Sequence, residues 1–196
     1  MNDPLWRALA VAGHTGDVAT ARGALASDDP VARELALGAL HRLGALTDDE
    51  LRTGMVDPHP TVRRRAVGIA ATRPTIDLLA SLGDPDVTVV EAAAWAAGEH
   101  ESVPDTVLIE LIRLAGEADD ALVREASVAA LGAIGDARGL PAILAACHDK
   151  PTVRRRAVLA LAPFDGPEVD TALAAALQDR DWQVRQAAED VAPDPG

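Results

Sequence analysis

One motif recurs six times along the chain and restricts the fold more than any other feature of the sequence. Each copy begins with Asp, continues through Pro or another turn residue, usually to a Val-Arg pair, and ends in small and aliphatic residues. The copies are DDPVARELALGAL (28–40), DPHPTVRRRAVGIA (57–70), DPDVTVVEAAAWAA (84–97), DDALVREASVAAL (119–131), DKPTVRRRAVLAL (149–161) and DRDWQVRQAAEDV (179–191). The positions equivalent to the arginine are 30, 27, 34, 30 and 31 residues apart. The chain is therefore a series of similar units, and repeats of about this length are typical of solenoids.

Each copy has the features of a helix start. Asp or Asp-Pro before the run offers an N-cap oxygen, or a preset φ, for the first amides of a helix. In the second copy the apolar residues Val62, Ala66, Ile69 and Ala70 recur with the spacing of one buried helical face. The side chains on this face are mostly small, so we expect neighbouring helices to approach closely.

A second helical segment is predicted between successive copies. Two of these segments begin with the spacing of a capping box, Thr47 with Glu50 and Asp165 with Glu168. The five segments are TDDELRTGM (47–55), PTIDLLASL (74–82), PDTVLIELIRLAG (104–116), ARGLPAILAAC (137–147) and PEVDTALAAALQ (167–178). Each unit is thus a helix pair, which buries its apolar face only by stacking on neighbouring pairs.

These patterns predict an all-α, right-handed α-solenoid of about six helix pairs that forms a single domain over residues 1–196. We expect residues 1–26 to form an N-terminal cap in which Trp6 and Leu9 pack inward, residues 27–191 to form the repeats, and residues 192–196 to form a tail. Trp182 is expected to be a core residue of the last unit. Aromatic residues make up only 2% of the chain, which disfavours the pleated surfaces of a β-sandwich or barrel.

Charge and cysteine content restrict the partners and the compartment. The formal net charge is -13, which disfavours binding to a phosphate backbone, because clustered Lys and Arg supply most of that affinity. The single cysteine, Cys147, excludes an intrachain disulfide, and its apolar segment predicts a small buried side chain. The chain has no basic and apolar leader pattern and no run of about 18 apolar residues. We expect a cytoplasmic protein with no membrane contact.

The Asp-x-x-x-Val-Arg-x-x-Ala pattern resembles HEAT repeats, specifically the short bacterial variety called PBS-lyase HEAT-like repeats, and the resemblance covers nearly the whole chain. It implies that the repeated Asp and Arg form a ladder that ties inter-helix turns and neighbouring repeats together. A guanidinium that binds a carboxylate through two hydrogen bonds suits this role. The expected ladder residues are Asp28, Arg33, Asp57, Arg63, Asp119, Arg124, Asp149, Arg154, Asp179 and Arg185.

The resemblance also implies that the helix of each motif copy lines the concave face of the solenoid. The row six residues after the buried Val, or its equivalent, reads Gly38, Gly68, Trp95, Ala129, Leu159 and Asp190. An exposed Trp between small residues is typical of an interface anchor. The alternative is that Trp95 is covered by the longer connection at 98–104.

Two motif copies carry Arg-Arg-Arg, and the ladder accounts only for the first arginine of each. The others either pair with the surplus of acidic residues or form basic spots that bind acidic groups of a partner. The candidate partner-binding residues on the concave face are Trp95, Leu159, Glu91, Arg64, Arg65, Arg155 and Arg156.

No catalytic, cofactor or metal constellation is evident. The five histidines are scattered and no pair has metal-ligand spacing on one helix, and no Ser-His-Asp set or phosphate-binding loop occurs. We therefore expect a monomeric, non-enzymatic scaffold or adaptor that binds a protein or peptide, with no cofactor. One alternative is a HEAT-like DNA glycosylase or nucleic-acid-binding protein, in which Glu91 lies one turn before Trp95. A less favoured alternative is a subunit of the phycobilin-lyase type.

Overall fold

The computed structural model describes residues 4–192, which contain thirteen α-helices, two short 3-10 helices and no strand. The chain divides into two compact units, residues 1–96 and 97–196. The first holds α1 (Pro4–Thr15), α2 (Val18–Gly23), η1 (Ala24–Ala26), α3 (Pro30–Arg42), α4 (Asp48–Met55), α5 (Pro60–Ala70), α6 (Leu79–Leu82) and most of α7 (Val87–Gly98). The second holds α8 (Asp105–Glu117), α9 (Ala121–Ile134), η2 (Ala137–Gly139), α10 (Leu140–Ala146), α11 (Pro151–Ala160), α12 (Pro167–Ala176) and α13 (Trp182–Val191). The all-α, α-solenoid class predicted from the repeats is confirmed.

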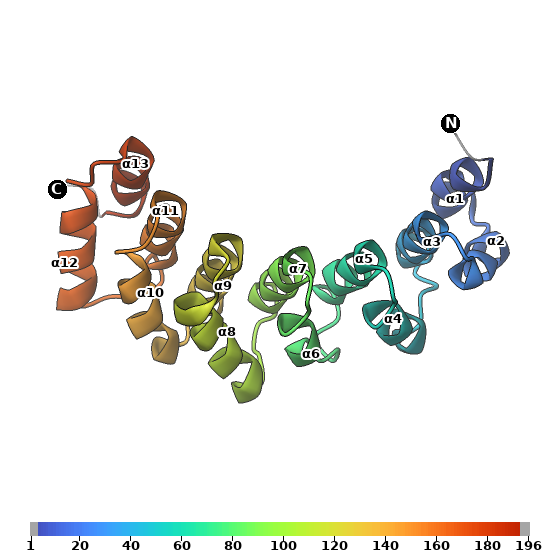
Figure 1. Cartoon of the computed structure of the whole chain (residues 1–196), viewed down its shortest axis with the longest axis horizontal. Coiled ribbons are helices and arrows are strands. Elements are labelled where there is room, and N and C mark those ends of the chain that lie inside the picture. Colours follow the sequence, from blue (N-terminus) through green and yellow to red (C-terminus); the bar gives the residue numbers. More distant parts are fainter. Residues whose placement is uncertain (1–3, 193–196) are drawn as a thin grey trace. The chain divides into compact units, whose positions relative to one another are not determined.

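The first unit has two layers of helices (Figure 1). In one layer α1 packs on α3 and α3 packs on α5, while α2 and α4 form the other layer. The predicted stripe of α5 is buried between them: Val62 is 1% exposed and Ala66 is fully buried. The small residues on this stripe bring neighbouring helices of the layer close together.

The second unit repeats this arrangement. Helix α9 packs on α11 and α11 packs on α13, with α8, α10 and α12 in the other layer (Figure 1). Gly132 of α9 lies against α11 so closely that a Cβ atom on it would be 2.6 Å from the Cβ atom of Ala160. The contact between α9 and α11 therefore depends on a glycine at this position.

Three motif helices, α3, α9 and α13, begin with the predicted aspartate cap, from Asp29, Asp120 and Asp181. Thr47 and Glu50 form the predicted capping box at the start of α4. The second predicted box, Asp165 with Glu168, is wrong. Gly166 is the N-cap of α12, with a φ of 124°, and makes no side-chain cap. Pro167 follows it as the first helical residue and presets the helical φ without a cap.

The segment predicted as a helix over residues 74–82 is helical only at Leu79–Leu82. The buried side chain of Ile76 and the hydrogen bond from its amide to the Arg73 carbonyl hold the preceding residues in a turn. The Asp77 carboxylate then accepts a hydrogen bond from the amide of Leu79. Local side-chain bonding of this kind competes with helix formation.

The ladder forms, and it connects each of the first, second, fourth and fifth motif copies to the copy that follows it. In four of the five ladder arginines, Nε and Nη2 donate to the two carboxylate oxygens of an aspartate 21–25 residues later, at distances of 2.6–2.9 Å. The pairs are Arg33–Asp57, Arg63–Asp84, Arg124–Asp149 and Arg154–Asp179. In each case Nη1 donates to backbone carbonyls in the turn before the arginine's own helix. One guanidinium thus holds its own turn and the next turn together.

The ladder differs from the prediction where the preceding copy offers no arginine or where no further copy follows. Asp28 and Asp119 contribute backbone carbonyls to Arg33 and Arg124 instead of a carboxylate. No motif copy precedes Asp28, and the copy before Asp119 has Val90 in place of arginine. Among residues 4–192, the one hydrogen bond of the Arg185 guanidinium, in the last copy, is to the carbonyl of Asp179.

The terminal tryptophans differ from each other. Trp6 packs against the cluster that contains the buried Leu9, as predicted, and its Nε1 donates to the Asp29 carboxylate at 2.5 Å. The prediction for Trp182 is wrong, because its side chain is 64% exposed. It is the first residue of α13, and the buried face of that helix begins at Val184. The predicted tail, apart from Ala192, lies outside the described residues.

Within residues 4–192, every helix is too short or too polar to cross a lipid bilayer.

Candidate functional site

A polar groove of the first unit lies over α3, α5 and α7, three successive motif helices. Its volume is about 470 Å³. The lining residues are Glu34, His41, Arg64, Arg65, Gly68, Ile69, Thr72, Ala92 and Trp95. We call this the Trp95 groove. It contains both of the chemical features that the sequence singled out in this half of the chain, a Trp in the outward row and the spare arginines of a triplet.

Trp95 and Gly68 determine the shape of the groove. Trp95 is 51% exposed, so the alternative in which it is a covered core residue is wrong. Gly68 has open space above it: a Cβ atom at this position would have no neighbour within 4 Å. An exposed indole beside a glycine without neighbours leaves room for a side chain of a partner.

Arg65 crosses the groove from α5 to α3. Its guanidinium lies against Gly38, where a Cβ atom would be 3.1 Å from the Nε atom of Arg65. Gly38 is buried under this side chain, so the row predicted to face outward is covered at this position. The neighbouring Arg64 is exposed. Neither arginine forms an ion pair with any carboxylate of the described residues.

His41 lies in the same groove and reports on its electrostatics. Burial, followed by the positive charges of Arg73, Arg65 and Arg42, lowers the pKa of His41 from its ordinary value. The imidazole is therefore neutral at pH 7 and adds no charge to the groove. The charged lining residues are two arginines and Glu34, which leaves one net positive charge in a strongly acidic chain.

The other predicted site residues are not part of the Trp95 groove. Glu91 lies one turn before Trp95 on α7, is half-buried, and does not line the groove. Arg155, Arg156 and Leu159 lie on α11 in the second unit, where Arg156 approaches Glu125 at 3.7 Å. The structure thus brings together Trp95, Arg64 and Arg65.

Two lining residues of α3, Glu34 and His41, were not predicted. Glu34 directly follows the ladder arginine Arg33, just as Arg64 directly follows Arg63 in the next copy. A comparison of this position between copies could have identified Glu34. His41 follows the sixth-residue row by one turn, and the sequence contains no signal that distinguishes it from the other histidines.

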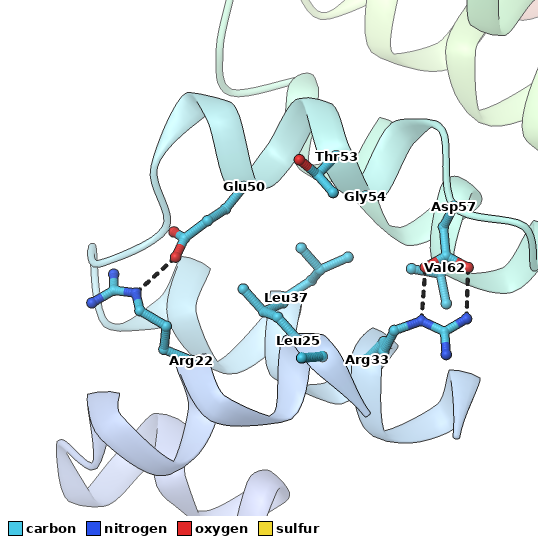
Figure 2. Close-up of a pocket in the computed structure, with 10 residues that line it drawn as sticks. Arg22, Leu25, Arg33, Leu37, Glu50, Thr53, Gly54, Asp57 and Val62 are labelled. Atoms are coloured by element: carbon cyan, nitrogen blue, oxygen red, sulfur yellow. Dashed lines mark hydrogen bonds and ion pairs between the residues drawn. The ribbon is translucent and has the colours of Figure 1, made fainter. Parts of the chain in front are cut away.

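A second cavity, of about 310 Å³, lies between α2, α3, α4 and α5 (Figure 2). Its floor is apolar and includes Leu25 and Leu37. Its charged groups are already paired within the chain: Arg22 with Glu50 on one side, and the ladder pair of Arg33 on the other. It therefore offers a ligand few free polar partners.

Reactive and metal-binding groups are sparse in the described part of the chain. Burial raises the pKa of the Cys147 thiol to about 11, which removes the thiolate at neutral pH. No group of three or more His, Cys, Asp or Glu among the described side chains is arranged to hold a metal ion. One His-Glu dipeptide occurs, at 100–101, directly after α7.

Comparison with solved structures supports the fold. The X-ray structure of Escherichia coli YibA matches 96% of this chain and 74% of its own, at 18% identity and a TM-score of 0.67. Human deoxyhypusine hydroxylase matches over 95% of this chain and 77% of its own, at 19% identity and a TM-score of 0.50. At these identities the likeness concerns architecture alone. No curated protein sequence matches the chain significantly.

The sequence model of HEAT repeats matches three overlapping segments, residues 49–132, 73–152 and 111–192. Together these segments cover well over half of the chain and include five of the six motif copies. The chain therefore belongs to the HEAT-repeat family.

Proposed function

We propose that this protein is a non-enzymatic interaction scaffold that binds an extended segment of a partner protein in the Trp95 groove. The single observation that carries the proposal is the exposed indole of Trp95 beside the open surface of Gly68. Trp and Arg are enriched at the energetic centres of protein interfaces. Here one Trp of α7 and two arginines of α5 without ion pairs line one groove.

The two halves of the chain provide an internal comparison. The octapeptide PTVRRRAV occurs at 60–67 in α5 and again at 151–158 in α11. Gly68 follows the first copy, whereas Leu159 follows the second. A leucine at position 68 would fill the space that the glycine leaves open. The two copies of the octapeptide therefore differ at the position that keeps this part of the groove open.

A binding role also agrees with the chemistry that the groove lacks. Its titratable lining residues are Glu34, His41 and two arginines, a set that contains neither cysteine nor lysine. HEAT and armadillo-like folds generally serve as surfaces for other proteins. We infer that the chain acts by holding a partner and not by transforming a substrate.

The experiment is a selection of random 12-residue peptides by display on the full chain, followed by affinity measurements for the enriched peptides. The test variants are Trp95→Ala and Gly68→Leu, and the control is Leu159→Ala, which changes the equivalent position of the second unit. Circular dichroism melts show whether each variant is folded.

We expect Trp95→Ala to weaken binding by roughly tenfold or more, because loss of a central Trp anchor commonly costs about 2 kcal/mol. Gly68→Leu should weaken binding similarly by filling the groove, and Leu159→Ala should have no effect. The proposal is overturned if no peptide is enriched, or if the enriched peptides bind both groove variants as tightly as the natural chain.

A further inference from the structure

The charge of the Trp95 groove identifies the kind of segment that it accepts. The chain has 31 acidic and 18 basic residues, so acidic side chains outnumber basic ones. Five other arginines of the first unit form ion pairs within the chain: Arg22, Arg33, Arg52, Arg63 and Arg73. Arg7 and Arg42 form none among the described residues, but they do not line the groove. Arg64 and Arg65, the two that line the groove, have no such partner among the described residues. These two charges are left for a partner to neutralise.

In the second unit, one arginine of the same octapeptide does have an acidic neighbour. In the copy of PTVRRRAV on α11, Arg156 approaches Glu125 of α9 at 3.7 Å. The corresponding residues of the first unit are Arg65 and Glu34, which both line the groove without forming an ion pair. Arg65 lies instead against Gly38, so its exposed side chain is partly packed on α3. A positioned cation loses less rotamer freedom when it binds an anion.

The apolar part of the groove lies beside these charges. Gly68, Ile69, Ala92 and Trp95 form a surface between α5 and α7. Neighbouring helices pack about 9 Å apart, so three of them extend over about 18 Å. An extended chain rises about 3.3 Å per residue, which corresponds to about six residues of a partner.

Resting on the proposed function, we infer that the Trp95 groove takes an acidic segment of a partner protein. A carboxylate of the segment binds Arg64 and Arg65, and an apolar side chain a few residues away lies over Gly68 against Trp95. Nucleic acid is the other common source of anionic groups. The net charge of -13 disfavours it, because a phosphate backbone presents one negative charge after another to the rest of the surface.

The test examines the composition of the selected peptides and the response of the best binder to charge. We expect the enriched 12-residue sequences to contain Asp or Glu near an aliphatic or aromatic residue. Replacing the acidic residues of the best peptide by Asn and Gln should weaken its binding roughly tenfold or more, because hydrogen bonds to charged groups are lost. Raising the salt concentration should weaken the binding of the acidic peptide and leave the affinity of the Asn and Gln version unchanged.

Matched variants of the two triplets locate the effect. The double variant Arg64→Ser, Arg65→Ser should bind the acidic peptide as weakly as the natural chain binds the amide peptide. The control double variant Arg155→Ser, Arg156→Ser removes the same residues from the other copy of the octapeptide and should bind normally. Circular dichroism melts of both variants exclude unfolding as the cause of a loss.

The outcomes separate this inference from the proposed function. Selection of neutral or basic peptides whose binding still requires Gly68 and Trp95 would contradict the inference that the partner segment is acidic. The groove would remain the binding site. Displacement of the best peptide by a single-stranded oligonucleotide at an equal concentration would also overturn the acidic peptide as the occupant. Binding that does not depend on Gly68 or Trp95 would overturn both.

Discussion

Gly68 and Leu159 occupy the same position after two identical octapeptides, and in the first unit the glycine leaves the surface of its helix open. A glycine inside a helix is destabilising relative to alanine, since it loses more conformational freedom on folding. Gly68 is not required for backbone geometry or for close packing, because its φ is ordinary for a helix and a Cβ atom would meet no neighbour. Binding in the groove gives a reason for its presence.

Two glycine substitutions should therefore act in opposite directions. Gly68→Ala should stabilise the chain by about 0.5–1 kcal/mol, which is the usual difference between Gly and Ala in a helix. Gly132→Ala should destabilise it by about 1–3 kcal/mol, because the added methyl group overpacks the contact with Ala160 of α11. Urea unfolding of both variants measures the difference. A loss of stability in Gly68→Ala would show that the surface above α5 is not open.

The ladder should contribute far more to stability than the neighbouring arginines. Arg154 is only 6% exposed and binds both carboxylate oxygens of Asp179. Arg154→Ala should cost about 3 kcal/mol or more, because it leaves a partly buried carboxylate without its partner. Arg155→Ala, one residue along and exposed, should change the free energy of unfolding by less than about 0.5 kcal/mol. Equal losses in urea melts would contradict the ladder.

Acid should weaken the ladder in a defined range of pH. Hydrogen bonds from Arg33, Arg124 and Arg154 lower the pKa values of Asp57, Asp149 and Asp179 below their ordinary value. For a depressed carboxyl pKa, the stabilisation is present above the unfolded pKa of about 3.9 and is lost as the pH falls through the folded pKa.

The free energy of unfolding should therefore receive a constant ladder contribution between pH 7 and 5 and fall below about pH 4. Urea melts at a series of pH values measure this dependence. The triple variant Asp57→Asn, Asp149→Asn, Asp179→Asn is the control and should show a shallower fall. An unchanged pH profile in this variant would assign the acid sensitivity to other carboxylates.

Tryptophan emission distinguishes the exposed indoles from the packed one. Trp95 and Trp182 are 51% and 64% exposed, whereas Trp6 is half-buried and hydrogen-bonded to Asp29. A variant that retains only Trp95 (Trp6→Phe, Trp182→Phe) should emit at long wavelength and be quenched readily by acrylamide. A variant that retains only Trp6 should be quenched less. Blue-shifted, protected emission from Trp95 would mean that the groove is closed in solution.

The sequence predicts the helices better than it predicts the contacts between them. The periodicity of the motif identifies the buried faces, and Thr47 with Glu50 identifies a helix start, because both depend on neighbours within a few residues. The turn before α6 and the exposure of Trp182 were not predicted, because they depend on which segment each residue packs against. Motif spacing also did not show that Arg33 binds the aspartate of the following copy, since Asp28 of its own copy is closer in sequence.

The candidate site was predicted only in part, for a similar reason. Trp95, Arg64 and Arg65 are unusual in the repeat pattern and could be identified from the sequence. The outward row predicted open space beside Trp95 at its glycines, and this is confirmed at Gly68. Gly38 occupies the same row and is covered by Arg65. Only coordinates distinguish these two glycines.

A nitrogen-15 NMR titration of the full chain with the best selected acidic peptide reports where that peptide binds. If the groove is the binding site, the indole N–H of Trp95 and the amide of Gly68 shift with the same affinity as the bulk binding curve. The same titration of Gly68→Leu should then show no shift at Trp95. Unchanged Trp95 and Gly68 signals at saturating peptide, with shifts confined to α8–α13, would contradict a partner site in the Trp95 groove.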